Sequence, residues 1–179
     1  ADVFTSSCTA PLSGIQTIGS GQDFETINDA VLALISCGVD GNVIFEIASG
    51  TYNEQIYIPA NFTGKNDEDA VTFRSASGNP EDVIISHDGS KDNNYVVKLD
   101  GLDNFVLENL TLEALNNAYG RLIEISNNAN HSRFNGNIFK GVPANENNDS
   151  LALIYYAKGS IDSAQVFTNN TFENGSKAI

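Results

Sequence analysis

The sequence has few basic residues: nine Lys and Arg stand against 23 Asp and Glu, which gives a formal net charge of −14. A chain this acidic has no basic surface with which to displace the counterions of nucleic acid. Nor does any apolar run approach the roughly 20 residues of a membrane span. We therefore exclude nucleic acid as a partner and insertion into a membrane, and expect an acidic extracellular protein or one that collects divalent cations.

Methionine is absent altogether, including an initiator methionine, and the sequence begins with Ala1. This predicts a chain that was processed or cut from a longer one, with a removed secretory signal as the expected history. We expect a secreted protein, located outside the cell or on the cell surface. Its 179 residues and 41% apolar composition suit one folded domain.

Cysteine is also scarce, since only Cys8 and Cys37 occur. In an exported protein such a pair usually forms a disulfide, which would join the N-terminal segment to the end of the first helix. Two buried thiols that pack as small apolar residues are the alternative.

What the sequence does contain is a repeat of alternating apolar and polar residues. Phe45, Val71, Val97 and Ile123 lie 26 residues apart, and each sits in a short segment with the period of a half-buried strand. A strand that recurs at a fixed step indicates a solenoid whose coils bury one another's apolar faces. The pattern predicts an all-β fold, a right-handed parallel β-helix, with these four side chains in one internal stack.

The repeat also sets the expected domain organisation. We expect one domain over 1–179, with an N-terminal strand segment at 1–20, an amphipathic capping helix at 21–38 and coils at 43–179. In the later coils Asn137 and Asn170 share a column, as do Leu107, Phe134 and Phe167. Asn suits the sharp turn between strands and can form a hydrogen-bonded ladder along the solenoid.

Two segments resemble the opening of a known family. DFETINDAV at residues 23–31 and GTYNEQIYI at residues 50–58 are similar to the "TIxxAV" helix and "GxYxExxxI" strand of pectin-lyase-like proteins, especially pectinesterases. With PLSG at 11–14 and VTFRSASG at 71–78, the first half of the chain also resembles β-helix modules of secreted and surface proteins of bacteria. The resemblance implies the fold of the first coils.

The chemistry of that family does not carry over. Pectinesterases, as the resemblance implies, use Asp, Arg and Gln residues in Gln-Asp-Thr, Asp-Phe-Ile-Phe-Gly and Leu-Gly-Arg-Pro-Trp runs. None of these runs occurs, and there is no tryptophan. We therefore assign no catalytic residue.

The 26-residue step predicts which outward side chains are neighbours. It places Lys98 beside Glu124, and Arg74 beside Asp100. Two carboxylates on one face could hydrolyse glycosidic bonds. Because each charge has an opposite partner one coil away, we favour cross-strand ion pairs on a solvated sheet.

Two kinds of ligand remain open. Acidic loops containing Asp67, Asp69, Asp88 and Asp92 offer oxygen ligands for Ca²⁺, with solvated turns as the alternative. The outward aromatic rings of Tyr57 and Tyr155 could stack on sugars, with isolated surface tyrosines as the alternative.

The function expected from these features is a non-catalytic structural or adhesive module of a surface protein or extracellular filament. Its partners would be other copies of itself or further coils of the parent protein, meeting at the solenoid end or at the N-terminal strand. The alternative is a domain that binds or cleaves polysaccharide, with glycans as partners.

Overall fold

The structure is a computed structural model that describes residue 8, residues 10–144 and residues 147–178. Residues 1–7 and 9 of the expected N-terminal segment, and residues 145–146 and 179 of the expected coils, lie outside the described residues.

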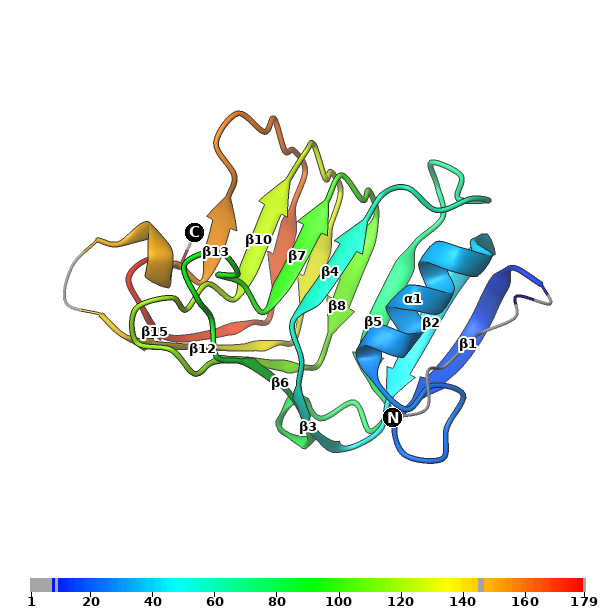
Figure 1. Cartoon of the computed structure of the whole chain (residues 1–179), viewed down its shortest axis with the longest axis horizontal. Helices are drawn as coiled ribbons and strands as arrows, with labels where there is room; N and C mark the ends of the chain where they lie inside the picture. Colours follow the sequence, from blue (N-terminus) through cyan, green and yellow to red (C-terminus); the bar gives the residue numbers. More distant parts are fainter. Residues whose placement is uncertain (1–7, 9, 145–146, 179) are drawn as a thin grey trace.

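The described chain winds into a right-handed parallel β-helix with three sheets, which confirms the predicted fold class (Figure 1). Every pairing between its named strands is parallel. Each complete coil contributes one strand to each sheet, so residues far apart in sequence become lateral neighbours.

The six-stranded sheet contains β1 (Leu12–Ile18), β2 (Val39–Ile47), β5 (Val71–Ser75), β8 (Phe105–Glu108), β11 (Arg133–Asn135) and β14 (Val166–Thr168). The five-stranded sheet contains β3 (Gly50–Asn53), β6 (Val83–His87), β9 (Thr111–Ala114), β12 (Ile138–Pro143) and β15 (Thr171–Gly175). The four-stranded sheet contains β4 (Ile56–Pro59), β7 (Val97–Asp100), β10 (Ile123–Ser126) and β13 (Ile154–Tyr156). Two short 3₁₀ turns, η1 (Pro80–Asp82) and η2 (Asp149–Leu151), lie in the connections.

The alternating residues explain the core, because every second side chain of a strand faces inward. Along the six-stranded sheet the inward residues include a phenylalanine stack, with ring centroids 4.6 Å apart for Phe45 and Phe73 and 4.7 Å apart for Phe134 and Phe167. Rings at these separations contribute packing energy beyond the area that they bury. The stack therefore holds successive coils in register.

The predicted stack of Phe45, Val71, Val97 and Ile123 is wrong in its register. The first two belong to the six-stranded sheet and the last two to the four-stranded sheet. Phe45 is paired with Phe73. The 26-residue step joins real neighbours only from β7 to β10, where Val97 meets Ile123. Elsewhere, loops of unequal length change the number of residues between paired strands. The alternation of apolar and polar residues is the same in all three sheets, so it does not reveal which strands are paired.

Asparagines build the turn between the six- and five-stranded sheets. Asn137 is 1% exposed, accepts a hydrogen bond from the Leu110 amide at 3.1 Å and donates to the Leu107 carbonyl at 2.8 Å. Asn170 in the next coil accepts from the Asn137 amide at 2.8 Å. The structure thus places Asn137 and Asn170 in one ladder, and buried backbone groups of the turn find partners there.

An amphipathic helix, α1 (Ile27–Cys37), lies against β1, β2 and β4 at one end of the solenoid (Figure 1). Thr26 and Asp29 form a capping box, and Gly38 ends the helix with φ +71°. The helix is shorter than the segment predicted at 21–38, because residues before Thr26 form a turn and a bridge to β1. In the described part of the chain no helix has the length and apolarity to cross a membrane.

The contacts of Glu54 explain why the helix motif at residues 23–31 and the strand motif at residues 50–58 occur together. Its carboxylate accepts hydrogen bonds from the Ile27 amide at 3.1 Å and the Asn28 amide at 2.9 Å, so the strand motif caps the helix motif. At the other end of the helix the structure places Cys37 in a disulfide with Cys8.

Candidate functional site

The outer face of the four-stranded sheet carries a row of four side chains in register. Tyr57 of β4 pairs with Lys98 of β7, Lys98 with Glu124 of β10, and Glu124 with Tyr155 of β13. They face outward because the residues on either side of each one point into the core. We call these four residues the outer row.

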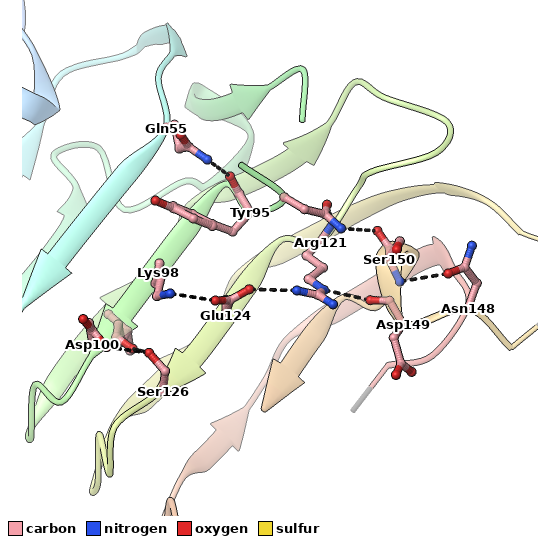
Figure 2. Close-up of polar contacts among 12 residues, drawn as sticks. Gln55, Tyr95, Lys98, Asp100, Arg121, Glu124, Ser126, Asn148, Asp149 and Ser150 are labelled. Carbon is pink, nitrogen blue, oxygen red and sulfur yellow. Dashed lines mark hydrogen bonds and ion pairs between the residues drawn. The ribbon is translucent and has the colours of Figure 1, made fainter. Parts of the chain in front are cut away.

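The two charges in the middle of the outer row are paired, as Figure 2 shows. The ammonium of Lys98 lies 2.8 Å from one carboxylate oxygen of Glu124, and the guanidinium of Arg121 lies 2.9 Å from the other. The Glu124 side chain is only 12% exposed. Partial burial alone would lower the pKa of Lys98, but the hydrogen bond and charge of Glu124 outweigh it and raise that pKa.

Arg121 connects this ion pair to the last coil. Its guanidinium carbon lies 3.4 Å from the ring centroid of Tyr155, and its Nε donates to the Asp149 carbonyl at 2.8 Å. A guanidinium over an aromatic face is an attractive cation–π contact. Arg121 therefore fixes the ring of Tyr155 and covers one of its faces.

A second polar group surrounds Asp100. Its carboxylate accepts hydrogen bonds from the hydroxyl of Tyr57 at 2.6 Å, the hydroxyl of Ser126 at 2.7 Å and the amide of Asn127 at 2.6 Å. Burial alone would raise the pKa of Asp100, but these donors lower it below its usual value. The hydrogen bond to Asp100, together with partial burial, raises the pKa of Tyr57 to about 12.

Tyr95 adds a third ring beside the row. The Lys98 ammonium lies 5.8 Å from its centroid, and the Gln55 side-chain amide donates to its carbonyl at 3.2 Å (Figure 2). Burial raises the pKa of Tyr95. The face thus combines aromatic rings with donors and acceptors whose positions are held by one another, which suits binding and orienting a hydroxyl-rich ligand.

The predicted ion pairs are half right. Lys98 meets Glu124 as expected, whereas Arg74 bonds Glu46 at 2.6 Å on the six-stranded sheet and lies on a different sheet from Asp100. Arg74 has a different neighbour from the one predicted, because the number of residues from β2 to β5 differs from the number from β7 to β10. Ion pairs that keep some exposure to solvent, as these two do, contribute under about 1 kcal/mol each.

The structure brings Tyr57 and Tyr155 into one row, at its two ends, and Tyr57 is 41% exposed. Sequence reasoning missed Arg121 and Tyr95, which precede the strands β10 and β7 by two residues each. Alternation gave no signal for them, because each lies two residues before an inward side chain, Ile123 or Val97, and would itself be expected to face inward.

The acidic residues considered for calcium lie in two loops. Asp67 and Asp69 follow β4, whereas Asp88 and Asp92 follow β6. Asp69 accepts from the Asn66 amide, and Asp88 accepts from the side chain of Asn116. Over the described residues, no group of three or more His, Cys, Asp or Glu side chains is arranged to hold a metal ion.

Comparison with known proteins identifies pectin-active relatives. The chain is 49% identical over 57 residues to a pectinesterase of Aspergillus aculeatus, which covers 32% of this chain and 17% of that protein. It is 38% identical over 89 residues to a pectinesterase of Aspergillus niger, which covers 47% of this chain and 26% of that protein. No family model matches.

A solved structure extends the likeness to most of the chain. The pectin methylesterase of Aspergillus niger matches with a TM-score of 0.63 and 26% identity, over 92% of this chain and 51% of that one. The chain thus has the fold of the pectin-lyase-like β-helix superfamily and spans about half the length of this relative.

These relatives correct the functional expectation. The prediction of a non-catalytic structural or adhesive module is wrong, because the matched proteins are named as enzymes acting on pectin. That expectation rests on the unpaired backbone groups at an open solenoid end, which favour stacking of one copy on another. The similarity favours the polysaccharide-active alternative instead.

Proposed function

We propose that this chain, a pectin-lyase-like β-helix, belongs to a protein that acts on pectin-class polysaccharide, and that it binds the polymer along the outer row. The similarity to pectinesterases supports the substrate class. The outer row supports the location, because it is the face where aromatic rings and fixed polar groups occur together.

The observation that carries the proposal is the placement of Tyr57 and Tyr155 at the two ends of the row, three strand steps apart. Neighbouring strands lie about 4.8 Å apart, so the row spans roughly 14 Å along the solenoid axis. A short run of sugar units has this length. Sugar rings would contact the tyrosines, and hydroxyls would bond Lys98, Asp100 and Glu124.

The residues of this face bind and orient the polymer. Asp100 and Glu124 are both held by donors, which suits accepting hydrogen bonds from sugar hydroxyls. The runs that carry the chemistry of pectinesterases do not occur in these 179 residues. The hydrolytic step is therefore assigned to no residue of this chain.

We also propose that the protein works outside the cell. An extracellular protein fits a pectin-class substrate, and the Cys8–Cys37 disulfide fits an oxidising compartment. Similarity to modules of bacterial surface proteins remains part of this proposal.

The binding proposal is tested with the double variant Tyr57→Ala/Tyr155→Ala. We expect binding to methyl-esterified pectin, measured by affinity electrophoresis, to weaken at least tenfold, because two stacking positions are lost. Ile15→Ala is the matched control, since Ile15 is 56% exposed on the six-stranded sheet. Unchanged binding by a folded double variant, judged by circular dichroism, would refute the proposal.

Charge predicts a preference among pectins. Lys98 and Arg121 share Glu124, and Lys98 also interacts with Asp100, so the two cations around the row are balanced by two carboxylates, while the whole chain carries −14. We expect methyl-esterified pectin to bind more tightly than polygalacturonate at low salt. Added salt should narrow the difference by screening repulsion of the polyanion. Titrations at low and physiological ionic strength measure both; tighter binding of polygalacturonate at low salt would contradict the expectation.

A further inference from the structure

Six asparagines in the chain are followed, two residues later, by a serine or threonine, and the residue between is not proline. They are Asn61, Asn109, Asn130, Asn148, Asn169 and Asn174. This motif is the acceptor of N-linked glycans in secreted proteins. Because a glycan is bulky and polar, a folded chain can carry one only on an asparagine whose side chain reaches solvent and is not needed by the fold.

Two of these asparagines are built into turns of the solenoid. The side-chain oxygen of Asn109 lies against Gly136, where an added Cβ would come within 2.3 Å of it. The side-chain amide of Asn130 donates to a backbone carbonyl at 2.7 Å, and its side-chain oxygen accepts two hydrogen bonds from the next coil. The hydroxyl residues of the two motifs, Thr111 and Ser132, are fully buried. A glycan at either turn would displace contacts between coils.

Three more of the motifs lie around the last described coil. Asn148 caps η2, because its side-chain oxygen accepts from the Ser150 amide at 2.9 Å. The side-chain amide of Asn169 donates to Asn135 at 3.0 Å. Asn174 is a residue of the strand β15. The first two side chains serve the local structure, and the third stands on a strand at the end of the described solenoid.

Asn61 differs from the other five, because it lies in the loop of residues 60–70 between β4 and β5. Asn61 and Thr63 are exposed, whereas Phe62 between them is 7% exposed and packs in the core. The Val39 amide donates to the Thr63 carbonyl at 2.9 Å and holds the loop from the other side. The Asn61 side chain takes part in none of the hydrogen bonds found in the described part of the chain. The fold therefore gives this side chain no task and leaves space around it.

We propose that Asn61 is a site of N-linked glycosylation. In the transfer, the side-chain nitrogen of Asn61 forms a bond to C1 of the first sugar, and the bond from C1 to the diphosphate of a lipid-linked oligosaccharide breaks. The amide gives up one proton, and the lipid diphosphate is the leaving group. The site rests on the proposed extracellular location, because the motif is modified in exported chains, and it does not depend on pectin binding.

The test uses the chain secreted from eukaryotic cells and treated with an endoglycosidase that leaves one N-acetylglucosamine on each glycosylated asparagine. We expect mass spectrometry of peptides to find this sugar on Asn61 and on neither Asn109 nor Asn130. Asn61→Gln and Thr63→Ala should abolish it at this site, whereas Thr63→Ser should keep it, because the motif needs a hydroxyl there. Asn66→Gln, which changes another exposed asparagine of the same loop outside any motif, is the matched control.

Circular dichroism of the same samples tests whether the fold tolerates the glycan. The spectrum should be the same before and after removal of the sugar, since Asn61 contributes no contact to the core. An unmodified Asn61 in a secreted chain whose Cys8–Cys37 disulfide is closed would overturn the site and leave the extracellular location standing. A sugar on Asn109 or Asn130 in the folded chain would also contradict the proposal, because it would show that the turns do not exclude a glycan.

Discussion

At the scale of single residues, the hydrogen bond from Tyr57 to Asp100 couples two protonation states across neighbouring strands. The pKa of Tyr57 is raised and that of Asp100 is lowered, so folding favours the protonated phenol together with the ionised carboxylate. The contribution of the Asp100 carboxylate is present above its unfolded pKa and is lost as pH falls through its lowered folded pKa. The contribution of Tyr57 is present below its unfolded pKa, near 10, and is lost as pH rises toward about 12.

This coupling predicts the alkaline titration of one tyrosine. In the wild-type chain, Tyr57 should ionise at about pH 12, and in Asp100→Asn it should ionise closer to pH 10, because the charged acceptor is gone. Absorbance of tyrosinate, compared with Tyr57→Phe to identify the signal, measures both values. An unchanged titration in Asp100→Asn would show that the carboxylate does not hold the proton.

At the scale of elements, α1 depends on a residue outside it. Glu54, just before β4, accepts the Ile27 and Asn28 amides and also the Asn28 side chain at 2.8 Å. The first four backbone amides of a helix lack partners within the helix. The Glu54 carboxylate accepts from two of them, and its negative charge is stabilised by the positive end of the helix dipole. The cap therefore joins α1 to the first coil.

Removing the cap should loosen α1 from the solenoid. We expect Glu54→Ala to lower the free energy of unfolding by roughly 2 kcal/mol, and Glu54→Gln by less, because an amide oxygen still accepts one bond. Urea unfolding followed by circular dichroism measures the loss. Glu68→Ala in the exposed loop after β4 is the control, and an equal effect of the two alanine variants would contradict the capping role.

At the scale of the whole molecule, the solenoid is a series of coils that contact only their neighbours, so its ends need separate protection. The disulfide from Cys8 to Cys37 and the helix α1 belong to the same end. Further coils of a longer protein, or a second copy, remain predicted partners for the other end. A calcium site in the acidic loops likewise remains a prediction.

Reduction should destabilise the whole fold. Cys8 and Cys37 are 29 residues apart, and a loop of this length gives about 3 to 4 kcal/mol in the chain-entropy description of disulfides. We expect the melting temperature to fall in reducing agent, and Cys8→Ser/Cys37→Ser to melt at the reduced value in either condition. A melting temperature indifferent to reductant, with both thiols free by mass spectrometry, would contradict this.

Alternation that recurs at a fixed step predicts a parallel β-helix, because a period of two decides which side chains face inward. The 26-residue step itself predicts the pairing of Lys98 with Glu124. Alternation could not decide which strands share a sheet. The sheet to which a strand belongs depends on the lengths of the loops before it. These lengths make Phe73 the neighbour of Phe45, and Glu46 the neighbour of Arg74. Only the tertiary structure decided the site. The winding of the solenoid places Arg121 over the ring of Tyr155, and it places Tyr155 in the same row as Tyr57.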